Sequence, residues 1–207
     1  MNPNLTEIIC VLDASGSMMP LRSDTIGGYN ALLEQHKSEP GDAFVTTVLF
    51  NSTPETIHDH VLIYDVPPLT DKDYCPSGMT ALLDAVGDTI ETVGKRLAAT
   101  PENDRPANII FVITTDGAEN VSHLYSLSQI KEMIEHQQSK YAWQFLFIGA
   151  GIDAYQASSS IGINAAHTAS YDASLDGINM VYTAASKGIS SIRCAAALDT
   201  SWKDGSQ

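Results

Sequence analysis

The chain has 207 residues, of which 43% are hydrophobic and 17% charged, and its formal net charge is −14. This composition is typical of one globular domain with room for a sizeable core, and it excludes an intrinsically disordered chain. The negative charge argues against nucleic acid and anionic membranes as partners, because an acidic surface repels both unless a cation intervenes. We therefore expect residues 1–207 to form a single domain that binds neither.

The cysteines and the N-terminal residues predict the cellular compartment. The number and spacing of the cysteines match no zinc pattern, and the three residues are Cys10, Cys75 and Cys194. The first residues, MNPNLTE, lack the charged and apolar regions of a signal peptide. No apolar run of the sequence approaches the roughly 20 residues that a membrane helix needs. We therefore expect a cytoplasmic protein with ordinary thiols.

Apolar runs predict the strands. In chain order these runs are 7–13, 43–51, 56–66, 107–116, 141–150 and the weaker 165–171. Most of them are continuously apolar, which is typical of strands covered on both faces. Only the turn STPE separates the second run from the third. A link this short permits a hairpin, so we expect the third strand to be antiparallel and to lie at an edge of the sheet.

Amphipathic segments alternate with these runs and predict the helices. In chain order the segments are 24–38, 80–99, 126–139, 153–161 and 174–197. The second has the clearest apolar stripe, with Leu83, Val86 and Ile90 at spacings of three and four. The third begins with SLSQ, which predicts a capping box. Strands that alternate with helices predict an α/β fold with a mainly parallel sheet.

Oxygen-bearing side chains gather where predicted strands end. The apolar run in IICVLDASGSMM stops at an aspartate, and two serines follow it at alternate positions. A second aspartate closes FVITTD, and the loop CPSGMT leads into the clearest helix. Ligands of open α/β sheets bind beyond the carboxyl ends of the strands, so we expect these three loops to converge. The five side chains are Asp13, Ser15, Ser17, Thr80 and Asp116.

This set of oxygens predicts a site for a hard divalent cation. Mg²⁺ prefers about six oxygen ligands and keeps some of its waters. Asp13 and Asp116 would balance the charge of the ion, and the three hydroxyls would complete its shell without adding negative charge. We therefore expect Mg²⁺, with Mn²⁺ and Ca²⁺ as the other candidates.

These motifs resemble the metal-ion-dependent adhesion site (MIDAS) of von Willebrand factor type A (VWA) domains. The motif of that family is Asp-x-Ser-x-Ser, then Thr, then Asp, and DASGS, SGMT and TTDG match all five positions. The resemblance covers essentially the whole chain, and the short bacterial and phage-type members look most similar in LDASGSM and TTDGAEN. It implies a three-layer, Rossmann-like, doubly wound, mainly parallel six-stranded sheet with one antiparallel edge strand and helices on both faces.

The resemblance also implies a role for each site residue. Ser15 and Ser17 would coordinate the metal directly, and Thr80 would do so directly or through water. Asp13 and Asp116 would hold the metal mainly through waters or second contacts. One coordination position would stay open, and in the family an acidic side chain of a partner often fills it.

Two functions follow as hypotheses. The first is a Mg²⁺-dependent protein-binding module that presents the open position to an Asp or Glu of a protein partner. The alternative is a Mg²⁺-dependent hydrolase or phosphoryl-transfer enzyme. No P-loop is present, and Ser15 stands where haloacid-dehalogenase-type phosphatases need a second aspartate. We therefore expect a module that is not an enzyme, while its partner and oligomeric state do not follow from the sequence.

Four other polar residues attract weaker hypotheses. Glu119 and Asn120 stand beside the second aspartate and are interpreted as a solvated loop or as the rim of a partner surface. The sequence HDH places His58 and His60 on one face of the predicted edge strand, which makes them a weak candidate for a second ion.

Overall fold

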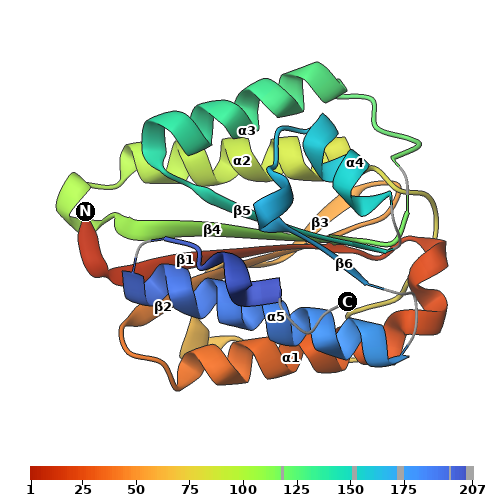
Figure 1. The fold of residues 1–207 in the computed structure, drawn as a ribbon, viewed down its shortest axis with the longest axis horizontal. Coiled ribbons are helices and arrows are strands. Elements are labelled where there is room, and N and C mark those ends of the chain that lie inside the picture. Colours follow the sequence, from red (N-terminus) through yellow and green to blue (C-terminus); the bar gives the residue numbers. More distant parts are fainter. Residues whose placement is uncertain (118, 151–152, 172–174, 196, 204–207) are drawn as a thin grey trace.

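The computed structural model describes residues 1–117, 119–150, 153–171, 175–195 and 197–203. Its centre is a six-stranded sheet in the order β3-β2-β1-β4-β5-β6 (Figure 1). The strands are β1 (Asn2–Asp13), β2 (Asp42–Phe50), β3 (Pro54–Leu62), β4 (Pro106–Thr115), β5 (Gln144–Ala150) and β6 (Thr168–Tyr171). Neighbouring strands run parallel, except that β3 is antiparallel to β2 at the edge. The predicted α/β sheet is therefore confirmed.

Helices cover both faces of the sheet, which gives three layers (Figure 1). The helices are α1 (Arg22–Lys37), α2 (Leu82–Ala99), α3 (Leu127–Tyr141), α4 (Ala154–Ser160) and α5 (Leu175–Ala195). Helices α1 and α5 lie on one face, and α2, α3 and α4 lie on the other. Of the helix predicted at 174–197, residues 174 and 196 lie outside the described residues. None of the described helices combines the length and apolar character needed to cross a membrane.

The apolar runs explain this arrangement. Along β1, Ile8 and Leu12 point into the core beneath α1 and α5, whereas Ile9 and Val11 point into the core beneath α2 and α3. All four side chains are fully buried. A strand that is covered on both faces buries its side chains on both sides, which explains why residues 8–12 are all apolar.

Two predicted strands end differently in the structure. The run 56–66 leaves the sheet after Leu62 and continues as a short 3-10 helix, Ile63–Asp65. Most of the first half of 165–171 forms another, Ala165–His167, so that β6 has only four residues. The predicted capping box is confirmed at the start of α3, where the side chains of Ser126 and Gln129 each accept the backbone N–H of the other.

The prediction that His58 and His60 share a face of the edge strand is wrong. The register between β2 and β3 shifts here, and His60 has a φ of 52°, so a bulge turns the strand. His58 approaches the Tyr29 hydroxyl at 3.4 Å on the α1 side. His60 stacks on Phe44 on the α2 side, with its Nδ1 3.4 Å from the buried carboxylate of Glu7. The two imidazoles therefore cannot bind one ion.

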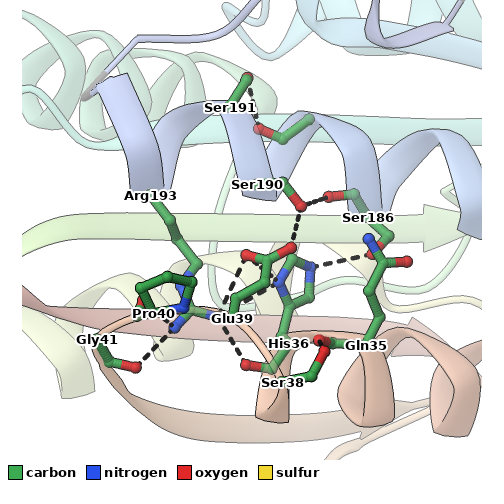
Figure 2. A network of polar contacts seen from close by, with 11 residues as sticks. Gln35, His36, Ser38, Glu39, Pro40, Gly41, Ser186, Ser190, Ser191 and Arg193 are labelled. Atoms are coloured by element: carbon green, nitrogen blue, oxygen red, sulfur yellow. Dashed lines mark hydrogen bonds and ion pairs between the residues drawn. The ribbon is translucent and has the colours of Figure 1, made fainter.

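The end of α1 is tied to α5 by a buried polar network (Figure 2). His36 is fully buried, with Nε2 3.1 Å from the Ser186 hydroxyl and Nδ1 3.0 Å from Glu39 Oε2. Ser190 donates a hydrogen bond to the other oxygen of Glu39. Arg193 donates to the His36 carbonyl oxygen at 2.9 Å. Burial lowers the pKa of His36, and the nearby Glu39 opposes this only in part, so the imidazole is neutral at pH 7.

This buried histidine predicts acid sensitivity. In the unfolded chain its pKa returns to the ordinary 6.5, so the unfolded state takes up a proton that the folded state resists. The free energy of unfolding should therefore fall as pH drops below 6.5, by at most about 1.4 kcal/mol per pH unit from this residue. Urea unfolding at several pH values would measure it. His36→Gln should flatten that slope, whereas the exposed control His136→Gln should keep it, and an unchanged slope in His36→Gln would contradict the assignment.

Candidate metal centre

The topology decides where the site lies. The strand order reverses between β1 and β4, because the chain proceeds from β1 towards β2 on one side and from β4 towards β5 on the other. Ligands of doubly wound sheets bind at this switch point, beyond the carboxyl ends of the strands. The loops that follow β1 and β4 meet there, beyond the right-hand ends of these strands in Figure 1.

Hydrogen bonds join the side chains of Ser15, Ser17 and Asp116 to one another, and Thr115 ties Asp13 to the end of β4. The Thr115 hydroxyl, on the last residue of β4, donates to Asp13 Oδ2 at 2.6 Å. The Ser17 hydroxyl donates to Asp116 Oδ1 at 2.7 Å and lies 3.0 Å from the Ser15 hydroxyl. The loops after β1 and β4 therefore form one cluster of oxygens.

The turn after β1 is held from within and from the loop before α2. Asp13 Oδ1 accepts the backbone N–H of Ser15 at 2.7 Å, which bends the chain immediately after the strand. Gly16 donates its N–H to the carbonyl oxygen of Gly78 at 3.1 Å, and the Tyr74 hydroxyl donates to the carbonyl oxygen of Asp13. A Cβ at residue 16 would stand 3.4 Å from the Gly78 oxygen, which is an ordinary contact distance.

Thr80 completes the group from the third loop. The residue is 3% exposed, and its hydroxyl makes no hydrogen bond within the described part of the chain. A Cβ built on Gly117 would stand 3.3 Å from Thr80 Oγ1 and 3.8 Å from Ser17 Oγ. The two hydroxyls therefore flank one small space, which any side chain at residue 117 would begin to fill. The structure thus places all five predicted residues together.

The charge of the cluster fits a divalent cation. Burial raises the pKa of Asp13, and the negative charge of Asp116 raises it further, while hydrogen bonds from Thr115 and Ser15 lower it in part. Among the described residues, neither aspartate is paired with a lysine or arginine. Arg22 instead donates to the carbonyl oxygens of Tyr74 and Asp71. An acidic set of oxygens without a protein cation is the chemistry that Mg²⁺ or a similar ion satisfies.

The described part of the chain holds no metal site of the usual histidine, cysteine and carboxylate type. No group of three or more His, Cys, Asp or Glu side chains in that part is placed to hold an ion. The present cluster differs in kind, because three of its five members are hydroxyls.

Sequence reasoning missed the function of Glu119 and Asn120, which do not form a merely solvated loop. Asn120 Oδ1 accepts the backbone N–H of Thr80 at 2.9 Å, and Asn120 donates its own N–H to the Thr80 carbonyl oxygen at 3.1 Å. Glu119 Oε2 accepts the N–H of Leu83 in the first turn of α2 at 2.9 Å. The signal was Ala81, because a helix that begins after alanine leaves its first N–H groups to find acceptors elsewhere.

Comparison with known proteins supports the fold. No protein-family model and no curated protein matches the chain. The structure is similar to proximal thread matrix protein 1 from the mussel byssus, with a TM-score of 0.57 and 14% identity over 86% of this chain and 44% of that one. It is also similar to the ArnB paralog VWA2 from Sulfolobus acidocaldarius, with a TM-score of 0.58 and 14% identity over 91% of this chain and 45% of that one.

A further structure of the mussel protein has a zinc-occupied MIDAS motif, and it aligns with a TM-score of 0.56 and 16% identity over 86% of this chain and 43% of that one. At such identities the likeness shows the shared fold alone. The chain spans less than half the length of these proteins. The fold implied by the VWA resemblance is therefore confirmed.

The raised pKa of Asp13 leads to a prediction for the metal-free protein. A carboxylate with a raised pKa is less stable as an anion in the folded state than in the unfolded state, so its charge costs stability above that pKa. Asp13→Asn keeps an oxygen for the Ser15 N–H and removes the charge. The thermal midpoint in EDTA at pH 7.5 should therefore rise. A fall in the midpoint, measured by calorimetry, would show that the carboxylate is already well compensated by protein groups.

Proposed function

We propose that this chain is a protein-binding module that depends on a divalent cation, with Mg²⁺ as the physiological ion. The observation that carries the proposal is the convergence of two carboxylates and three hydroxyls from three loops at the switch point of the sheet. Ser15, Ser17 and Thr80 would hold the ion through their hydroxyl oxygens. Asp13 and Asp116 would balance its charge from positions behind these hydroxyls, as their hydrogen bonds to Thr115 and Ser17 suggest.

A bound ion would supply strong electrostatic attraction for one further oxygen anion. Mg²⁺ takes six oxygen ligands, and only the three hydroxyls would contact it directly. The remaining positions are left for water and for one ligand from outside the chain. We propose that this ligand is an Asp or Glu side chain of a protein partner. A carboxylate is the fitting group, because a chain with net charge −14 would on the whole repel it, whereas the ion would attract it.

The comparisons support this proposal in a coarser form. One of the similar solved proteins has a zinc-occupied MIDAS motif, which supports a divalent ion without specifying magnesium. From the sequence we further propose a bacterial or phage-type member in the cytoplasm that binds neither nucleic acid nor a membrane.

We also propose that the chain is not an enzyme. Phosphoryl transfer needs cations around the transferred group, and Arg22, at the margin of the loop after β1, is engaged with backbone oxygens and Asp71. None of the hydrogen bonds described around the five site residues comes from a histidine or lysine that could act as a general base. Hydrolysis of generic phosphoesters or nucleotides by the Mg²⁺-loaded protein would contradict this and favour the alternative enzyme.

Mg²⁺ should stabilise the folded protein, because three distant loops form the site only when the chain is folded. At a free concentration 100 times the dissociation constant, the free energy of unfolding should rise by about 2.7 kcal/mol. Thr80→Ala removes one hydroxyl and should reduce that gain without changing the stability in EDTA by more than about 1 kcal/mol. Thermal unfolding with and without Mg²⁺ measures both effects. A wild-type midpoint that ignores Mg²⁺, Mn²⁺ and Ca²⁺ alike would overturn the metal site.

The partner should depend on the ion. A pull-down in millimolar Mg²⁺ should recover a protein that EDTA releases, and Thr80→Ala should weaken its capture strongly. Changing the key acid of that partner to its amide should weaken the complex at least tenfold, because an amide oxygen carries no charge for the ion. A partner whose affinity survives both EDTA and Thr80→Ala would bind another face of the chain.

A further inference from the structure

The loop 119–125 wraps around the start of α2, and its contacts are more extensive than a connecting loop requires. Asn120 holds both sides of the Thr80 backbone, since its side chain accepts the Thr80 N–H and its own N–H binds the Thr80 carbonyl oxygen. These two hydrogen bonds form a ring between Asn120, in the loop after β4, and Thr80, which stands two residues before the start of α2. The two hydrogen bonds therefore fix the backbone of Thr80 relative to Asn120.

The same loop supplies the cap that α2 lacks. Helix α2 begins after Ala81, which has no side chain able to accept a hydrogen bond. The N–H of Leu83 binds Glu119 at 2.9 Å, and the N–H of Asp84 binds the Ser122 hydroxyl at 3.1 Å. The Ser122 hydroxyl in turn donates to Glu119 at 2.7 Å. The first N–H groups of the helix are thus satisfied from another loop.

Helix α2 in turn binds the loop through the buried carboxylate of Asp84. Asp84 accepts the N–H groups of His123 and Leu124 at 2.9 Å and that of Tyr125 at 3.1 Å. The ring of Tyr125 lies against the helix, where a Cβ at Gly87 would stand only 2.6 Å away. Glu119 and residues 122–125 are therefore anchored to α2, and Asn120 is anchored to Thr80 just before it, which joins the loop to the start of the helix.

Glu119 takes part in this junction as an anion. Burial alone would raise its pKa, but the N–H groups of Ser122, Leu83 and Val121 and the Ser122 hydroxyl outweigh burial and lower it. A carboxylate that accepts hydrogen bonds from this many donors is ionised and fixed in orientation at neutral pH. Its negative charge also interacts favourably with the positive end of the α2 dipole, at the start of the helix.

We infer that Asn120, supported by Glu119 and Ser122, is a positioning residue that fixes the Thr80 hydroxyl and thereby makes the metal site selective for small cations. The inference rests on the proposed metal site. Mg²⁺ demands short, nearly ideal contacts, whereas Ca²⁺ accepts longer and more variable ones, so selectivity follows the rigidity of the ligands. A Thr80 held on both sides of its backbone cannot retreat to accommodate the larger ion. If the Thr80 backbone were freed, the affinity for Mg²⁺ should fall more than the affinity for Ca²⁺.

Asn120→Ala tests this by removing the side-chain acceptor of the Thr80 N–H. Titration calorimetry of the metal-free protein with Mg²⁺ and with Ca²⁺ gives two dissociation constants for each variant. Mg²⁺ affinity should fall about tenfold, the usual cost of losing a group that orients a metal ligand, and Ca²⁺ affinity should fall less than about threefold. Asn120→Asp keeps the acceptor and should restore the wild-type ratio of the two constants.

The matched control is Asn164→Ala. Asn164 also holds a backbone N–H with its side chain, that of Ala166 at 2.8 Å, but it precedes the parallel edge strand β6 and so lies towards the amino ends of the strands, away from the site. It should change neither constant, which separates positioning from a general loss of stability. If Asn120→Ala does not fold, Ser122→Ala is measured by the same criterion, because it removes the acceptor of the Asp84 N–H.

The outcomes are distinct. A fall in Mg²⁺ preference in Asn120→Ala or Ser122→Ala, but not in Asn164→Ala, supports the inference. Wild-type binding of Mg²⁺ with an unchanged ratio of constants in the loop variants overturns the inference and leaves the proposed metal site intact. Failure of the wild-type protein to bind either ion overturns the proposed site and the inference with it.

Discussion

A carboxylate without a protein cation, buried at the end of an inner strand, is the constraint on which the rest of the site depends. Asp13 is fully buried, and no lysine or arginine of the described chain is paired with it. Such a charge is costly unless hydrogen bonds and an opposite charge surround it. The Ser15 N–H and the Thr115 hydroxyl supply the hydrogen bonds. Among the described residues no lysine or arginine supplies the opposite charge, which is why we propose that a cation from solution does.

The sheet topology determines where that cation would bind. Because β1 and β4 are parallel neighbours, residues just beyond their carboxyl ends lie side by side, and the pairing of Leu12 with Thr114 brings Asp13 level with Thr115, one residue before Asp116. The third contribution, Thr80, comes from no strand at all. Its position depends on the start of α2, and that start depends on the loop after β4. The site is therefore as precise as the contact between that loop and the helix.

The sequence predicted the parts of this structure that local patterns determine. Continuous apolar runs reveal strands that are covered on both faces, and the spacing of Asp13, Ser15 and Ser17 shows the turn that follows one of them. The bulge at His60 was not predictable from alternation, because a single inserted residue reverses the faces without changing the composition. The roles of Glu119 and Asn120 were missed for a related reason. Their partners are about 36 and 40 residues away, so neither neighbouring sequence nor periodicity reveals them.

The negative net charge would help the proposed module to distinguish its specific partner from other acidic proteins. With a net charge of −14, the chain repels an acidic partner over most of its surface, and this repulsion weakens non-specific contacts with the very class of ligand that the ion attracts. Attraction at one point within a repulsive field favours a partner whose acid projects far enough to reach the ion while its remaining surface is neutral or basic. Specificity then arises from the contrast between one metal contact and its surroundings. A rigid Thr80 sharpens that contrast, because the ion stays at a fixed place relative to the surface that surrounds it.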